Sequence, residues 1–180
     1  MAHSSWVISD THFSHRLMAT LRGFTTTEEM DEVLISKWNA LVKPHDRVYH
    51  LGDFCINRKA IPIAARLNGN IVLIKGNHDI FKLKDYVDYF DDIRAYKVLT
   101  DANVILSHIP LHPSQLWDGT TGRYSVNIHG HTHEFKLSDP RYVNACVEHT
   151  ENSPVLLDIY LRKVKEIKEL YPPQVRGRVE

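Results

Sequence analysis

The sequence has no long hydrophobic run and only two cysteines, and each shortage excludes a class of protein. No segment approaches the roughly 18 apolar residues of a membrane span, and we expect no secretory leader before the first apolar run. Cys55 and Cys146 form neither a set of pairs nor a C-x-x-C pattern, so a disulfide framework or zinc knuckle is not expected. These shortages predict a cytoplasmic protein with no membrane partner.

An excess of charge of either sign is also missing. The 22 basic side chains balance the 22 acidic ones, so the formal net charge is zero with histidine neutral. This balance gives no general reason to bind nucleic acid, although a local basic patch is compatible with it. The 12 histidines are many for 180 residues, and they are dispersed instead of clustered at a terminus as in a tag.

The length and the patterning predict one domain over residues 1–180, with no internal repeat or linker. Thr26 and Glu29 form a capping-box pattern ahead of a helix that should end before Pro44. A last helix is expected over residues 157–171, with Ser153 and Pro154 at its start, and residues 171–180 are expected to form a flexible tail. Other predicted segments are a loop at 13–25, a helix at 58–67, a hairpin of 93–99 with 104–107, and a long loop at 109–124 that borders the site.

Five short apolar runs, at residues 6–9, 48–51, 71–74, 104–107 and 126–129, end in polar side chains. Such runs are typical of buried strands, and ligands gather beyond the carboxyl ends of strands in α/β sheets. An extended backbone would also point Asp10 and His12 the same way, because one residue separates them. We therefore predict a single site that includes the following side chains: Asp10, His12, Asp53, Asn77, His108, His131 and His133.

These donors comprise two carboxylates, one amide and four imidazoles. A mixed oxygen and nitrogen set without thiolate suits divalent Mn, Fe, Zn, Co or Ni. Seven donors are too many for one tetrahedral ion, and they fit two ions about 3.5–4 Å apart that share a carboxylate. Two dications against two carboxylates leave roughly two positive charges, or about one after a hydroxide binds, so an anionic substrate is expected.

The motifs resemble those of the calcineurin-like metallophosphoesterase superfamily, in particular its small bacterial and phage members. The matching motifs, in chain order, are Asp10-x-His12, Gly52-Asp53, Gly76-Asn77-His78-Asp79, His108 and Gly130-His131-x-His133. The resemblance covers roughly residues 6–160. It implies a four-layer α/β/β/α sandwich, in which two mixed β-sheets are flanked by helices.

The resemblance also implies a role for each residue. One metal would be held by Asp10, His12 and His133, the other by Asn77, His108 and His131, and Asp53 would bridge them. His78 would contact no metal, would donate a proton or hydrogen bond to the phosphate ester, and would be oriented by Asp79. The expected activity is hydrolysis of phosphomonoesters or phosphodiesters, including nucleotides or cyclic nucleotides, by a metal-bound hydroxide, with Mn as the leading metal. Many relatives carry a second acidic residue where this sequence has Ile56, so no substrate role transfers there.

Several alternatives stay open at this stage. Five further residues are candidates either for contact with the substrate or for a structural role: His15, Arg22, Arg58, His112 and Tyr124. His50 and His129 are either core residues or groups that support a ligand. A binding scaffold with a decayed site is the competing function. A metallo-β-lactamase-type site is excluded, because Glu134 and Phe135 follow His133 where His-x-His-x-Asp-His is required.

Overall fold

The structure is a computed structural model that describes residues 3–171. Its strands form two sheets, in the orders β4-β3-β2-β1-β9 and β5-β6-β7-β8. The strands are β1 Ser5–Ile8, β2 Arg47–His50, β3 Asn70–Ile74, β4 Asp92–Arg94, β5 Tyr96–Leu99, β6 Val104–Ser107, β7 Val126–His129, β8 Tyr142–Asn144 and β9 Val155–Leu156. Each sheet is mixed, because β9 is antiparallel to β1 and β5 is antiparallel to β6, while the other pairs are parallel.

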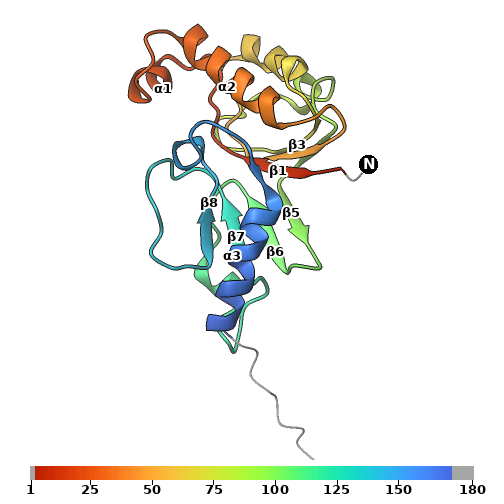
Figure 1. Cartoon of the computed structure of the whole chain (residues 1–180), viewed down its shortest axis with the longest axis vertical. Helices are drawn as coiled ribbons and strands as arrows, with labels where there is room; N and C mark the ends of the chain where they lie inside the picture. The colour runs from red at the N-terminus through yellow and green to blue at the C-terminus, as the bar shows by residue number, and fades with distance from the viewer. Residues whose placement is uncertain (1–2, 172–180) are drawn as a thin grey trace, which may run out of the picture.

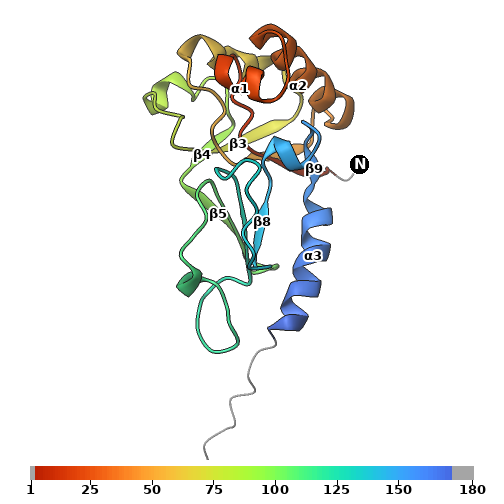
Figure 2. The same ribbon diagram turned by 90° about the vertical axis from the view of Figure 1, so that its left-hand side faces the viewer.

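Helices flank the two sheets (Figures 1 and 2). The α-helices are α1 Arg16–Leu21, α2 Thr27–Leu41 and α3 Leu157–Leu170. The 3₁₀ helices are η1 Arg58–Arg66, η2 Leu83–Asp85, η3 Pro113–Gln115 and η4 Val147–His149. In both views α1, α2 and η1 lie together on the outer side of the first sheet, whereas α3 runs past the second sheet. The predicted mixed α/β fold, with two mixed sheets flanked by helices, is confirmed.

The first sheet is covered on both faces, which explains why its strands read as continuous apolar runs. Along β3, Ile71 and Leu73 pack with α2 and η1 in one core, whereas Val72 and Ile74 face the other core. This second core also contains the inward side chains of the second sheet and one side of α3. The carboxyl ends of β1, β2, β3, β6 and β7 therefore meet near one edge, where the two sheets adjoin.

Helix α2 begins and ends as predicted. The Thr26 hydroxyl accepts a hydrogen bond from the Glu29 N–H at 3.1 Å, and the helix ends at Leu41, before Pro44. The return contact differs from a standard capping box, because the Glu29 carboxylate accepts from the N–H of Thr25 at 2.8 Å. The pair therefore satisfies one N–H group of the first turn, that of Glu29, and one N–H group just before the helix, that of Thr25.

Two local predictions are wrong, and a third is confirmed in part. The predicted hairpin is formed by β5 and β6, which pair antiparallel with Leu99 opposite Val104. Its first strand begins at Tyr96 instead of Ile93, because Ile93 and Arg94 belong to β4 in the first sheet. The predicted loop at 13–25 contains α1, whose first turn is capped by the His15 side chain. Ser153 and Pro154 do not start the last helix, because β9 pairs with β1 first and α3 begins at Leu157. The expected tail lies outside the described residues, apart from Tyr171.

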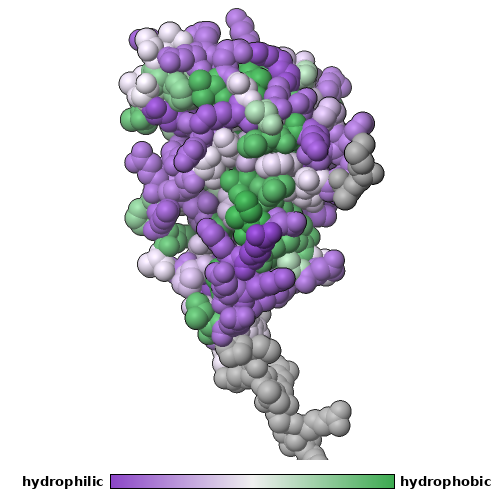
Figure 3. Space-filling view, in the orientation of Figure 1, coloured by the Kyte–Doolittle hydropathy of each residue, from purple (hydrophilic) through white to green (hydrophobic). Residues whose placement is uncertain are grey.

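None of the helices within residues 3–171 is long and apolar enough to cross a membrane. The face shown in Figure 3 is largely hydrophilic and carries scattered hydrophobic patches.

Candidate metal centre

The backbone at the strand ends is unusual. Five residues that are not glycine have left-handed conformations there: Asp10 (φ 60°), His12 (φ 50°), Asp53 (φ 53°), His131 (φ 70°) and His133 (φ 46°). Such conformations cost about 1–3 kcal/mol each and cluster at functional sites. The expected extended backbone at Asp10 and His12 is therefore wrong, and turned backbone directs both side chains to the same place.

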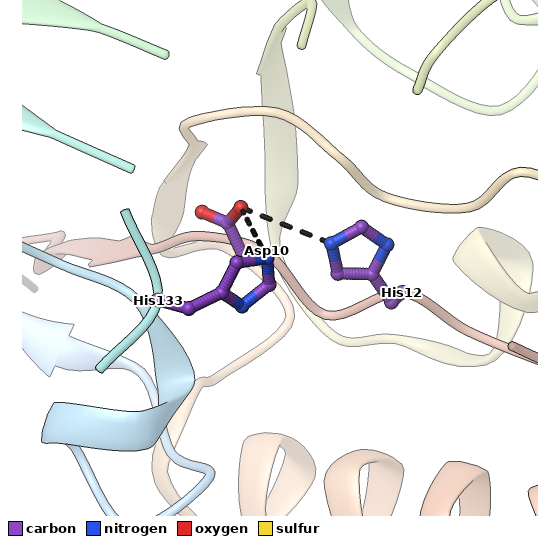
Figure 4. Close-up of side chains that lie close together, drawn as sticks. All are labelled: Asp10, His12 and His133. Carbon is purple, nitrogen blue, oxygen red and sulfur yellow. Dashed lines mark ion pairs between the residues drawn. The ribbon is translucent and has the colours of Figure 1, made fainter. Parts of the chain in front are cut away.

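One group of donors consists of Asp10, His12 and His133, which lie within 4.8 Å of one another and are drawn in Figure 4. Asp10 Oδ1 is 3.9 Å from His12 Nε2 and 3.8 Å from His133 Nε2. Among the described residues, Asp10 Oδ1 and both ring nitrogens of His12 are buried without a hydrogen-bond partner. Burial, assisted by the charge of Arg22, lowers the pKa of His12 to about 2, so the ring is neutral. Buried polar atoms without partners are costly, and a divalent cation between these atoms would satisfy them.

The other carboxylate oxygen of Asp10 is held by the protein. Asp10 Oδ2 accepts hydrogen bonds from the Ser9 hydroxyl at 2.5 Å, the His131 N–H at 2.9 Å and the Cys146 thiol at 3.2 Å. These three contacts fix the carboxylate and leave Oδ1 directed at the two imidazoles. Ser9 and Cys146 were not predicted as part of the site, because no sequence motif connects them to Asp10.

A buried ion pair orients His133. Its Nδ1–H donates to Glu148 Oε1 at 2.9 Å, and the Arg22 guanidinium donates to the same oxygen at 2.6 and 3.0 Å. Although burial acts to raise it, the pKa of Glu148 is lowered to about 2 by the hydrogen bond from His133 and the charge of Arg22. The hydrogen bond to Glu148 raises the pKa of His133. In the neutral ring Nδ1 carries the proton, so Nε2 presents its lone pair toward Asp10.

Arg22 therefore has a different position from the one expected of a substrate contact. Its side chain is 6% exposed, and it also donates to the backbone carbonyls of Asp10 at 2.6 Å and Thr11 at 2.9 Å. The guanidinium therefore stabilises the loop after β1, which carries Asp10 and His12. Glu148 was missed altogether, because 126 residues separate it from Arg22 in the sequence.

We expect Glu148→Gln to weaken metal binding at this group by about 10–100-fold, as the loss of other outer-shell partners does. Glutamine keeps the size of the side chain, but it removes the charge that pairs with Arg22. The measurement is calorimetric titration of the metal-free protein with Mn, with Glu169→Gln on the exposed face of α3 as the matched control. Equal affinities in both variants would show that the ion pair does not support the metal site.

The second group of donors converges on Asn77. Its Oδ1 is 2.8 Å from His108 Nε2 and 2.8 Å from His131 Nδ1. His108 Nδ1 lies 2.9 Å from the Leu51 carbonyl, which can only accept, so that nitrogen carries the proton. In the neutral ring, His108 Nε2 and Asn77 Oδ1 then both present lone pairs. Burial and the neighbouring His108 lower the pKa of His131, which favours its neutral form as well.

Asp53 lies between the two groups. Its Oδ1 is 3.4 Å from His108 Nε2, and its Oδ2 is 3.6 Å from His12 Nε2. Burial raises the pKa of Asp53, and a cation beside the carboxylate would favour the charged form. The structure thus brings all seven predicted ligand side chains together, with one carboxylate oxygen toward each group. Two sets of these side chains are close enough to hold a metal ion, namely Asp10 with His12 and His133, and Asp10 with Asp53 and His108.

Glycines allow the ligand loops to approach this closely. A Cβ atom on Gly76 would collide with Asp53 Oδ1, and one on Gly130 would collide with Asp10 Oδ2. Gly52 has a φ of 98°, and a Cβ there would meet the Gly76 backbone. In these three motifs the glycine that precedes the donor is therefore required by the close contact between loops.

His78 projects toward the same centre but belongs to neither group of donors. Its side chain is 38% exposed, and its Nε2 is 3.9 Å from Asp53 Oδ2. The ring centroid is 5.3 Å from that of His12. This position, open to solvent beside the carboxylate, leaves the ring free to contact a bound ester.

Asp79 does not orient His78, so that expectation is wrong. The buried Asp79 carboxylate accepts hydrogen bonds from the N–H groups of Asp53, Phe54 and Gly76, at 2.9, 3.0 and 2.9 Å. Within residues 3–171 it makes no hydrogen bond to His78. Burial raises the pKa of Asp79 to about 6. The side chain instead joins the loop after β2 to the loop after β3.

We expect Asp79→Asn to lower the free energy of unfolding by about 1–3 kcal/mol, because an amide has one acceptor oxygen for three buried N–H donors. Urea unfolding with chelator present would measure this effect apart from metal binding. Asp88→Asn, at an exposed position nine residues on, is the control and should change little. An unchanged midpoint for Asp79→Asn would argue against this role.

The remaining candidates for substrate contact are dispersed. His15 lies at the rim, with its ring centroid 5.4 Å from that of His12 and 6.5 Å from that of His78. Arg58 pairs with Asp85 at 3.2 Å, and within residues 3–171 no hydrogen bond or ion pair joins it to the donors.

The other open residues also have structural contacts. Tyr124 lines a cleft that also includes His108. His112 caps η3. His50 is buried, and its Nδ1 accepts from the N–H of Gly52, so it supports the loop that carries the bridging carboxylate.

Comparisons with known proteins agree with this geometry. The family model described as the calcineurin-like phosphoesterase superfamily domain matches residues 4–147. The chain is 34% identical over 181 residues to the uncharacterized protein MJ1445 of Methanocaldococcus jannaschii, an alignment that covers 91% of this chain and 92% of that protein. It also resembles the crystal structure of AQ665, a protein of unknown function from Aquifex aeolicus, with a TM-score of 0.67 and 27% identity. That match covers 94% of this chain and 100% of the other.

Proposed function

The chain belongs to the calcineurin-like phosphoesterase superfamily, and on that basis we propose that it is a phosphoric ester hydrolase that uses two divalent metal ions. Members of this superfamily are generally metal-dependent phosphoesterases, and the chain contains candidate ligand groups. The observation that carries the proposal is the placement of Asp53, with one carboxylate oxygen toward each of two converging sets of donors.

The proposed ligand sets follow from the two groups. Asp10, His12 and His133 would hold one ion, Asn77, His108 and His131 would hold the other, and Asp53 would contact both. Bound ions would supply a hydroxide-like nucleophile near neutral pH and neutralise charge on the phosphoryl oxygens. The oxygen and nitrogen donors suit Mn, which is the metal we propose, and also Fe, Zn, Ni or Co.

The protein's own groups supply the remaining chemistry. His78 is exposed beside the bridging carboxylate, so we propose that it donates a proton or hydrogen bond to the departing ester oxygen. The backbone N–H of His78 donates to Asp53 Oδ1 at 2.8 Å, and this hydrogen bond holds the His78 backbone beside the carboxylate. The proposed partner is a small phosphate ester, because the cluster lies at the surface and admits solvent at His78 and at His133.

A turnover screen tests the proposal. Phosphomonoesters, linear diesters and 2′,3′-cyclic nucleotides are each supplied with Mn, Ni, Zn or Mg, and bound metal is counted in parallel. We expect hydrolysis of at least one ester class with two bound ions, and its loss in chelator. Two bound ions without turnover of any ester would overturn the enzyme proposal and favour the binding scaffold.

A further inference from the structure

A cleft of about 580 Å³ opens beside the second group of donors. Asn77 and His108 form part of its wall, so the cleft is continuous with the candidate metal centre. The rest of the wall comes from β5, β6 and the segment at residues 109–124, which the sequence predicted to border the site. The volume falls within the roughly 300–1,000 Å³ of sites that hold small organic ligands.

Aliphatic and aromatic side chains form much of the wall of this cleft, together with polar residues that include Asn77, Ser107 and Gln115. Ile109 is 53% exposed and Tyr96 is 55% exposed, although both are large hydrophobic side chains, and Tyr124 and Leu111 continue the same wall. Among the described residues that line the cleft, Lys75 is the one with a permanent charge. Its ammonium group is engaged elsewhere, since it donates to the Phe81 carbonyl at 3.2 Å and lies 5.3 Å from the centre of the Tyr86 ring. The cleft therefore suits an uncharged ring and offers no free cation to a second phosphate.

The cleft and His78 lie on different sides of the bridging carboxylate. The cleft side carries His108, whose Nε2 is 3.4 Å from Asp53 Oδ1, whereas His78 and His12 face Asp53 Oδ2. A phosphate held between the two groups would thus have a proton donor on one flank and an apolar cleft on the other. A monoester has one organic group and could use only one of these flanks.

We propose that the preferred substrate is a phosphodiester whose retained ester group, an aromatic ring or nucleoside, lies in the cleft while the other group departs beside His78. This inference rests on the proposed function. Water forms the new bond to phosphorus, the bond to the departing oxygen breaks, and His78 delivers the proton to that oxygen. The products are an alcohol and a phosphomonoester that still carries the group in the cleft.

The test compares methyl, phenyl and thymidine-5′ p-nitrophenyl phosphate, which share one leaving group and differ in the retained group. We expect kcat/KM to favour the phenyl and thymidine esters over the methyl ester by about 10–100-fold, from burial of the ring. Ile109→Ser should reduce that ratio severalfold. Leu170→Ser replaces another exposed aliphatic residue, at the end of α3 and outside the cleft, and should preserve the ratio. Comparing ratios between proteins cancels the intrinsic reactivity of each ester.

A binding measurement separates this inference from the proposed function. Calorimetry on the metal-loaded protein should show that phenylphosphonate binds more tightly than methylphosphonate, and that Ile109→Ser narrows the difference. Turnover of diesters with equal ratios in wild type and Ile109→Ser, and equal phosphonate affinities, would overturn the cleft assignment and leave the hydrolase intact. A phosphonate preference that depends on Ile109, in a protein that hydrolyses no ester, would support the cleft and overturn the hydrolase. A preference for p-nitrophenyl phosphate over all three diesters would overturn the phosphodiester assignment.

Discussion

Asp53→Asn should lose binding at both metal positions and reduce turnover by at least about 100-fold, more than the loss of an outer-shell partner costs. The amide keeps the shape of the side chain, but it removes the negative charge that lies between the two groups of donors. With Asp10 as the remaining carboxylate among the proposed ligands, two dications would be poorly neutralised. Each position would therefore bind more weakly, because Asp53 presents one oxygen to each.

The measurement is metal content after equilibrium dialysis, combined with turnover at saturating Mn. Asp101→Asn, at an exposed turn before β6, is the matched control and should retain two ions and full activity. Two tightly bound ions and normal turnover in Asp53→Asn would remove the bridging role. Loss of a single ion would assign Asp53 to one group only.

His78→Ala should retain both metals and lose about 10²–10⁴-fold in rate on esters with alkyl or nucleoside leaving groups, the range typical of a general acid. An alkoxide needs a proton as its bond to phosphorus breaks, whereas p-nitrophenolate is stable enough to depart without one. The loss on p-nitrophenyl esters should therefore be much smaller. The His78 side chain is 38% exposed beside Asp53 Oδ2, so its removal should leave the buried donors in place.

A leaving-group series for wild type and variant, with metal content checked in both, measures the effect. His45→Ala, at an exposed turn before β2, serves as the control. Equal losses across the series would assign His78 to positioning the phosphate instead of proton donation. Loss of a metal ion would make His78 a ligand and would require a new assignment of the second group.

The sequence by itself determined which donors meet and at which edge. The apolar runs mark buried strands by their length and composition, and parallel strands place their carboxyl ends together. Donors that directly follow these runs therefore converge, whatever the details of the loops. The start of α2 could also be predicted from the sequence, because an N-terminal cap depends on residues only three positions apart.

The tertiary structure alone decided how those donors are held. Asp79 follows His78 in the sequence, yet its carboxylate bonds to N–H groups of a loop about 25 residues away. Arg22 and Glu148 are buried partners across 126 residues, and neither belongs to a motif. The run at 93–99 divides between two sheets because the pairing partners, β3 and β6, lie in different layers. Each of these arrangements depends on contacts between residues that are distant in the sequence. The spacing of neighbouring residues does not specify such contacts.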